Sequence, residues 1–257
     1  MRYIQHWLRS GHRNGHGIHS PYVYDLVRNV VFNKAGMEAD PVSVSYHRKL
    51  KTIDSWITVH DLGAGSSVEK GSSRSISSIA RYSSVTMKNG ALLYRIARWY
   101  KPAMVIEFGT GLGISTSYLA TGAGDVPFVS MEGSSEKQAF ALKHNAESGN
   151  EHVKMLLGDF DRFLDTIVGS CINQTLVFID GDHRYKPTLD KVDRFLGRSE
   201  LSDMILILDD IHWSTGMEQA WRECANRKEV AISIDLFYYG LLIVRPGIEK
   251  QHFRVKY

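Results

Sequence analysis

From residue 103 onward, short apolar runs alternate with amphipathic segments, and this alternation restricts the fold more than any other feature of the chain. Seven runs have the length and composition of buried strands, at residues 103–108, 127–131, 152–157, 175–180, 204–210, 230–237 and 240–246. Helical patterns fill the first five gaps, so these strands must be mostly parallel. The last two runs are joined too tightly for a crossover and require an antiparallel hairpin. We predict an α/β, Rossmann-like fold: a doubly wound, seven-stranded, mostly parallel sheet whose last strand is antiparallel.

Residues 1–99 lack this alternation. Apolar residues have helical spacing at 20–32 and 90–100, and a serine-rich polar segment at 66–84 lies between these two stretches. We expect a helical N-terminal cap over residues 1–99 that carries a mobile loop, followed by the sheet domain at 100–257. His12, His16 and His19 lie in a glycine-rich segment that we interpret as an active-site lid rather than a metal site.

The composition argues against several classes of partner. The net charge of +3 comes from 31 basic and 28 acidic residues without a concentrated block, which argues against nucleic acid. No run approaches the roughly 18 apolar residues of a membrane span. Cys171 and Cys224 are far apart and lack metal-finger spacing, as expected in a reducing cytosol. We expect a cytoplasmic protein with neither nucleic acid nor membrane as a partner; a homodimer is left open.

Two glycine-containing loops compete as the cofactor site. TVHDLGAGSSVEK at 58–70 and MVIEFGTGLGISTSYLA at 104–120 each place an acid and glycines after an apolar stretch. A ligand loop needs a strand behind it and a helix in front of it. Only 104–120 meets both conditions, because a polar segment follows Asp61 and no further strand is expected before residue 103. Gly63 and Gly65 are therefore predicted to shape a turn, with a place in a lid as the alternative.

The glycine spacing also bears on the identity of the cofactor. Gly109, Gly111 and Gly113 form GxGxG rather than the GxGxxG of dinucleotide sites. Glu107, just before the loop, suits a cationic ligand without a diphosphate, and S-adenosylmethionine is such a ligand. Glu132 ends the next predicted strand, where an acid can accept hydrogen bonds from both ribose hydroxyls.

With these residues in place, residues from about 84 to 245 resemble the class I S-adenosylmethionine-dependent methyltransferases, and among them the O-methyltransferases of the catechol and caffeoyl-CoA type. VTMKNGALLYRIARWYKPAMVIEFGTGLGIST looks like that family's helix, first strand and cofactor loop. LLGDFDRFL resembles its third-strand motif, FIDGDHRY its FxDADKxxY pattern and LILDDIHW its DNxxW pattern. The resemblance implies that Asp159 contacts the adenine amino group.

The resemblance also implies a set of site residues. The expected cofactor-binding residues are Glu107, Gly109, Thr110, Gly111, Gly113, Ser115, Glu132, Gly133, Asp159, Phe160 and Asp180. A divalent cation such as Mg²⁺ would be held by Asp180, Asp209 and Asp210, although the family has asparagine where this chain has Asp210. His183 replaces the family's catalytic lysine and is expected to act as the base, together with Asp180 as a catalytic residue.

Structural roles compete with several of these assignments. Acids at strand ends often cap the following helix, and His183 could simply hydrogen-bond to Asp182 or to a loop carbonyl. His212 and Trp213 are expected to form an acceptor wall, with a core role as the alternative for Trp213. Tyr238 and Tyr239 are expected to pack rather than react.

We predict a methyltransferase that acts on a hydroxyl of a small-molecule acceptor, assisted by a divalent cation. The alternatives are a nicotinamide-dependent oxidoreductase, which GxGxG disfavours, and a non-catalytic cofactor-binding protein, which the intact acids disfavour.

Overall fold

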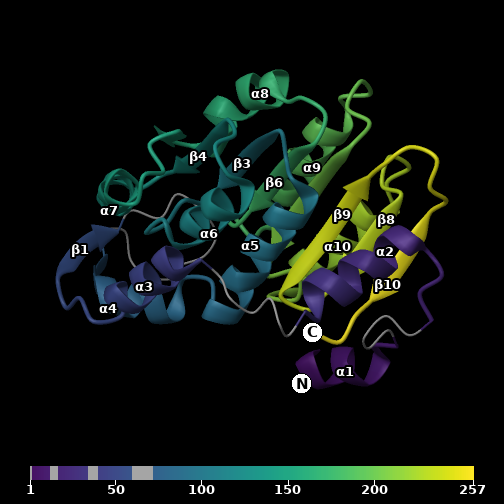
Figure 1. Ribbon diagram of the computed structural model, residues 1–257, viewed down its shortest axis with the longest axis horizontal. Helices are drawn as coiled ribbons and strands as arrows, with labels where there is room; N and C mark the ends of the chain where they lie inside the picture. Colours follow the sequence, from purple (N-terminus) through teal and green to yellow (C-terminus); the bar gives the residue numbers. More distant parts are fainter. Residues whose placement is uncertain (1, 12–16, 34–39, 60–71) are drawn as a thin grey trace.

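An eight-stranded sheet with helices on both faces runs through the computed structural model, which describes residues 2–11, 17–33, 40–59 and 72–257 (Figure 1). The strand order is β10-β8-β9-β7-β6-β3-β4-β5. The strands are β3 (Met104–Phe108), β4 (Phe128–Glu132), β5 (Val153–Leu157), β6 (Thr175–Ile179), β7 (Met204–Asp209), β8 (Ile232–Asp235), β9 (Tyr239–Val244) and β10 (Gln251–Arg254).

The sheet confirms the predicted Rossmann-like architecture and adds one strand to it. Strands β3 to β7 are mutually parallel, and β9 runs antiparallel to both of its neighbours, β7 and β8. The eighth strand, β10, pairs parallel with β8 at the edge of the sheet. It escaped prediction because its four residues, QHFR, alternate between exposed and half-buried positions and form no apolar run.

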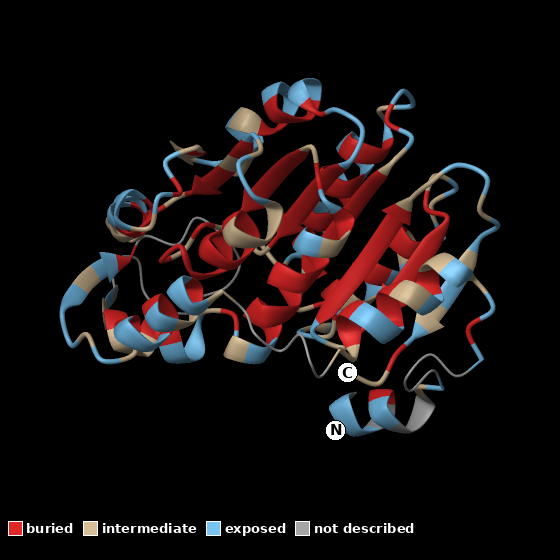
Figure 2. Ribbon diagram, in the orientation of Figure 1, coloured by how far each residue is buried: buried red, intermediate tan, exposed pale blue. Residues whose placement is uncertain are grey.

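Both faces of the central part of the sheet are buried, which explains why β3, β6, β7 and β9 are continuous apolar runs. Side chains alternate between two cores: Val105 of β3 belongs to one, and Ile106 and Phe108 belong to the other. The first core includes α5 (Met87–Tyr100) and α6 (Ile114–Ala123), and the second includes α8 (Phe160–Ser170), α9 (Tyr185–Leu196) and α10 (Thr215–Asn226). Figure 2 shows the central strands buried along their whole length.

The N-terminal part is mainly helical, as predicted, but it also contains a small sheet. Its helices are α1 (Arg2–Arg9), α2 (Pro21–Asp25), which continues as the π-helical turn η2 (Leu26–Val31), α3 (Pro41–Leu50) and α4 (Ile76–Tyr82). Strands β1 (Trp56–Val59) and β2 (Ser72–Ser75) pair antiparallel. The serine-rich segment therefore contains a strand and a helix, and the expectation of no strand between residues 61 and 103 is wrong.

That small sheet still supports the choice between the glycine loops. β1 and β2 are antiparallel and form a sheet of their own. They therefore do not form the parallel strand–helix–strand unit that a cofactor loop requires. Asp61, Gly63 and Gly65 themselves lie outside the described residues, as do His12 and His16. The division of the chain into 1–99 and 100–257 stays a prediction.

The contact between α5 and α6 holds the N-terminal helices against the sheet. A Cβ added to Gly122 of α6 would lie 2.5 Å from the Tyr94 carbonyl oxygen of α5, so only glycine allows the two backbones this approach. A second glycine at this contact makes room for an aromatic side chain. Gly90 of α5 leaves space for the Tyr118 ring of α6, which is fully buried.

Replacing Gly122 with alanine should therefore destabilise the protein. We expect a loss of about 1–3 kcal/mol in the free energy of unfolding, the usual cost of overpacking, measured by denaturant titration. Gly169→Ala in α8 is the matched control, because a Cβ there would have no neighbour within 4 Å. Since alanine has a higher helix propensity than glycine, this variant should be as stable as the wild type or more stable. Equal stability of the two variants would contradict the packing role of Gly122.

Candidate active site

The site lies where the connections of the sheet diverge. Strand β3 lies between β4 and β6, so the chain leaves it toward one side for β4 and reaches β6 on the other. In open α/β sheets, ligands bind at such a switch point, beyond the carboxyl ends of the strands. The loop at residues 109–113 follows β3 at this point. The choice of the second glycine loop over the first therefore agrees with the topology.

Gly109 is confined by both neighbouring strands. Its N–H donates to the Met131 carbonyl oxygen of β4 at 2.9 Å, and a Cβ on it would lie 2.1 Å from the Asp180 carbonyl oxygen after β6. Its φ of +101° is also unfavourable for other residues. Gly113, at φ +80°, precedes the first residue of α6, and its Cβ would lie 2.9 Å from the Ala141 Cβ. The glycine pattern thus reflects close backbone packing.

A buried polar network lies beneath the loop. Glu107 is fully buried and accepts hydrogen bonds from Thr116 Oγ1 at 2.5 Å and Ser130 Oγ at 2.6 Å. Burial raises the pKa of its carboxyl group. Thr110 Oγ1 lies 2.5 Å from the same Ser130 hydroxyl. Four expected cofactor contacts do not line the pocket and instead lie under or beside the loop: Glu107, Thr110, Gly113 and Ser115.

A cavity of about 490 Å³ opens beyond the carboxyl ends of the strands. The expected residues that line it are Gly109, Gly111, Glu132, Gly133, Asp159, Phe160, Asp180, His183, Asp209, Asp210 and Trp213. Further lining residues were not foreseen, among them Arg74, Arg81, Ser84, Thr86, Asn89, Lys137, Lys191 and Tyr238. Most of these come from α4, the start of α5 and the hairpin, where the polar sequence has no pattern typical of a ligand site.

Glu132 connects the end of β4 with the glycine loop. Its Oε2 accepts from the Gly111 N–H at 2.7 Å, and its Oε1 accepts from the Ser134 N–H at 2.9 Å. Each carboxylate oxygen can accept a further hydrogen bond. Glu132 therefore fixes the loop and keeps acceptor capacity toward the cavity.

Asp159 and Phe160 form another part of the wall. Asp159 caps α8, since its Oδ1 accepts from the Asp161 N–H at 3.2 Å. The Phe160 ring meets Phe108 edge to face, with centroids 5.6 Å apart. It also lies so close to Gly181 that a Cβ there would be 2.5 Å from a ring carbon. The glycine of the DGDH sequence is explained by this ring.

Two carboxylates and an imidazole converge beside the glycine loop. Asp180, His183 and Asp209 each offer a ligand atom within 4.8 Å of the others. His183 Nε2 lies 3.5 Å from Asp180 Oδ1, and Asp182 pairs with Arg184. Burial and the neighbouring carboxylates raise the pKa of Asp180 to about 8 and that of Asp209 well above its ordinary value.

Asp210 lies next to the convergent group, and its role as a metal ligand stays a prediction. It has φ +52° and lines the cavity, and burial raises the pKa of its carboxyl group. The group of three that converges within 4.8 Å consists of Asp180, His183 and Asp209 and does not include it. The left-handed backbone at Asp210 turns the chain just after β7, which the sequence motif does not indicate.

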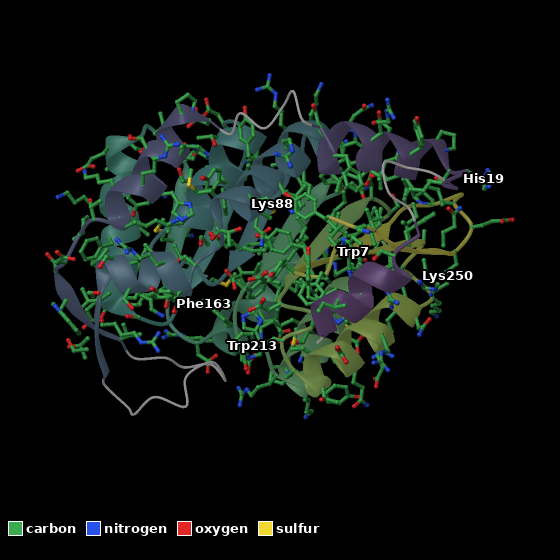
Figure 3. The ribbon with its side chains drawn as sticks, turned by 90° about the horizontal axis from the view of Figure 1, so that it is seen from below. Trp7, His19, Lys88, Phe163, Trp213 and Lys250 are labelled. Carbon is green, nitrogen blue, oxygen red and sulfur yellow. The ribbon has the colours of Figure 1, made fainter. Side chains whose placement is uncertain are left out.

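The aromatic wall also differs from expectation. Trp213 lines the cavity and is 69% exposed, so the core alternative is wrong (Figure 3). Tyr238 lines the cavity too, while Tyr239 is buried as expected. His212 does not line the cavity but lies between Glu218 and Asp235. Tyr238 therefore takes the place that His212 was expected to fill.

Comparisons with known proteins agree with this geometry. Residues 106–211 match a sequence family described as a methyltransferase domain, and no curated protein matches the chain. Three solved structures have the same fold. Rv0187 from MTB, in a cofactor-bound form, is 17% identical, with 88% of this chain and 97% of that chain covered at a TM-score of 0.59.

The other two are O-methyltransferases. TomG from Streptomyces achromogenes, involved in tomaymycin synthesis and solved with S-adenosylmethionine, is 22% identical, with coverage of 63% and 82% at a TM-score of 0.53. The enzyme from Bacillus cereus, in complex with S-adenosylhomocysteine, is 20% identical, with coverage of 63% and 83% at a TM-score of 0.52.

Residues 106–211 thus match a methyltransferase domain, and the fold is that of the class I S-adenosylmethionine-dependent methyltransferases, structurally similar to O-methyltransferases. The nicotinamide alternative is not supported by these comparisons. Among the described residues, no helix is long and apolar enough to cross a membrane.

The acidic cluster should make stability depend on pH in the absence of metal. Because the folded protein raises the pKa of Asp180 from 3.8 to about 8, this group's stabilising contribution is complete below about pH 4 and lost as pH rises through 8. The pKa of Asp209 is raised in the same direction by burial and by the charges of Asp180 and Asp210. In chelator, Asp209→Asn, which does not titrate, should therefore flatten the fall in unfolding free energy between about pH 5 and 8.5, and should stabilise the protein by roughly 1–3 kcal/mol at the upper end. Asp125→Asn, at a 97% exposed side chain, is the control. Identical pH slopes for Asp209→Asn and the wild type would contradict the repulsion.

Proposed function

We propose that this methyltransferase transfers the methyl group of S-adenosylmethionine to a hydroxyl oxygen of a small molecule, with help from a divalent cation. One observation carries the proposal: the cavity joins the glycine loop and Glu132 to a cluster of carboxylates and one histidine. The O-methyltransferases of the same fold support it. The cofactor supplies a methyl group on a cationic sulfur, and the new O–CH₃ bond forms as the S–CH₃ bond breaks.

The cofactor would lie along the glycine loop. Gly109 and Gly111 leave the backbone open to the ligand, and Glu132 would accept hydrogen bonds from the ribose hydroxyls. Asp159 would accept from the adenine amino group, with Phe160 beside the ring. Glu107 would act indirectly, since its carboxylate holds Thr116 and Ser130 beneath the loop.

A hard divalent cation fits the acidic cluster. Asp180 and Asp209 converge with half-buried carboxylates, Asp210 follows directly in the chain, and burial raises the pKa of all three. Oxygen ligands are those that Mg²⁺ prefers. When bound, the cation would lower the pKa of an acceptor hydroxyl.

His183 is the proposed base. Its Nε2 would accept the hydroxyl proton, and Asp180 Oδ1, 3.5 Å away, would stabilise the imidazolium that results. Trp213 and Tyr238 would enclose the acceptor at the open end of the cavity, and α4 with the start of α5 would complete the wall. The helical cap is thus proposed to contribute to acceptor binding.

Removing the ribose acceptor should weaken cofactor binding. For Glu132→Ala we expect a loss of about 1.5–3 kcal/mol in the affinity for S-adenosylhomocysteine, the range for a hydrogen bond to a charged group, measured by isothermal titration calorimetry. Glu147→Ala, at an exposed position on α7 (Ser135–Glu147), is the control. An unchanged dissociation constant in the Glu132 variant would reject this cofactor position.

Chelation and substitution test the chemistry of the acidic cluster. With a panel of small hydroxyl compounds as acceptors, release of S-adenosylhomocysteine should fall in chelator and recover with Mg²⁺, and Asp209→Ala should abolish the recovery. His183→Ala should lower the rate about 10²- to 10⁴-fold without loss of cofactor affinity, whereas His152→Ala, remote from the cavity, should not. Full activity in chelator would reject the metal role, and no activity on any acceptor would favour the non-catalytic alternative.

A further inference from the structure

A second group of metal-ligating side chains lies outside the cavity, at the contact between α1 and the sheet. It consists of His6 on α1, His212 in the loop after β7 and Asp235 at the end of β8, and each offers a ligand atom within 4.8 Å of the others. His212 Nε2 lies 3.1 Å from both carboxylate oxygens of Asp235, and His6 Nε2 lies 2.9 Å from Oδ1. Two imidazoles therefore turn the same ring nitrogen toward one carboxylate.

The opposite nitrogen of each ring faces an oxygen. Nδ1 of His212 lies 3.1 Å from Glu218 Oε1, and Nδ1 of His6 lies 3.3 Å from Ser10 Oγ. A histidine that donates through Nδ1 carries a lone pair on Nε2, and a carboxylate behind the ring is the usual support of a metal-binding histidine. The geometry orients both Nε2 atoms as ligands.

His6 gives an independent indication. Its side chain is 4% exposed, and its Nε2 lies 2.9 Å from Asp235 Oδ1 without forming a hydrogen bond to any of the described residues. A buried ring nitrogen without a partner is costly. A cation between His6, His212 and Asp235 would satisfy it.

We propose that His6, His212 and Asp235 bind a divalent cation of the zinc type, with Glu218 orienting His212. Two imidazoles and one carboxylate form a donor set that suits Zn²⁺ or Co²⁺, unlike the oxygen-rich cluster at the cavity. Phe237 covers the group: its ring centroid lies 5.1 Å from that of His212 and 5.4 Å from that of His6. This aromatic cover restricts solvent.

Two nearby arginines compete with a metal ion for the carboxylates of the group. Arg254 Nε lies 3.3 Å from Asp235 Oδ2, and its side chain is 43% exposed. Arg222, which pairs with Glu218 at 3.5 Å, is 73% exposed. Both side chains can move into solvent when a metal ion takes over the carboxylates.

The proposed ion would fasten the N-terminal helix beside the cavity. Tyr3 of α1 packs against Phe237 and Tyr238, with centroids 4.9 and 6.5 Å apart, and Tyr238 lines the cavity. Lys256 also lies over the Trp7 ring, so α1 contacts the C-terminal segment as well (Figures 1 and 3). This inference concerns a site separate from the acidic cluster and holds whether or not the proposed O-methylation is correct.

Metal titration of a background variant tests the site. Asp180→Asn combined with Asp209→Asn removes two of the three proposed ligands of the acidic cluster, so the chelator-treated double variant should bind one equivalent of Zn²⁺ by calorimetry. Co²⁺ should give visible absorption bands typical of nitrogen ligation. In this background His6→Ala and His212→Ala should each weaken binding by at least about tenfold, and Glu218→Gln by about 10- to 100-fold. His19→Ala should have no effect.

Arg254→Gln separates a metal site from a plain ion-pair cluster. If the group binds metal, loss of the competing positive charge in this variant should tighten Zn²⁺ binding. If the group is only an ion-pair cluster, the variant should lose thermal stability without any gain in Zn²⁺ affinity. If His212→Ala fails to fold, His6→Ala still tests the site, because His6 lies in the terminal helix α1. Circular dichroism would confirm that the His6→Ala variant is folded. Absence of saturable Zn²⁺ binding in the background variant, or binding unchanged by His6→Ala, would overturn the proposal.

Discussion

The close approach of Gly109 to the Asp180 carbonyl oxygen is the contact on which the site depends. No side chain fits at residue 109, because its Cβ would lie 2.1 Å from that oxygen. The neighbouring backbone hydrogen bonds, from the Asp180 N–H to Phe108 and from the Gly109 N–H to Met131, hold the loop between β6 and β4. This packing places Glu132 on one side of the loop and Asp180 on the other. Cofactor and acceptor chemistry can therefore share one cavity.

The protein holds its buried acids in two different ways. Glu107 is surrounded by hydroxyl donors from Thr116 and Ser130, which compensate part of the cost of burial. Asp180 and Asp209 instead face one another, with His183 as the nearby imidazole. In the first arrangement Oε2 is held by both hydroxyls, whereas Oε1 has no hydrogen-bond partner among the described residues. In the second arrangement, the negative charge of the two carboxylates needs a bound proton or cation to balance it. Such perturbed carboxylates are typical of functional sites.

The N-terminal helices are part of the site's support. The Tyr46 hydroxyl of α3 donates to the Leu112 carbonyl oxygen at 2.6 Å, within the glycine loop itself. Ser43 of α3 lies 2.8 Å from the Ser117 hydroxyl of α6, so the helix that follows the loop is held from the same side. Changes in the N-terminal part can thus reach the loop through direct hydrogen bonds. The proposed metal group at α1 would add a second connection at the other end of the cavity.

The order of strands and helices, the choice of glycine loop and the acids at strand ends followed from the sequence, because buried parallel strands are apolar runs and their carboxyl ends meet at one edge. Local pattern could not decide where a side chain turns: Glu107 points beneath the loop, Asp210 takes a left-handed backbone, and His212 turns from the cavity toward Asp235. The short edge strand β10 and the β1–β2 pair lacked apolar runs. His6, His212 and Asp235 are brought together only by the docking of α1 on the sheet, since contacts between residues so distant in sequence exist only in the tertiary structure.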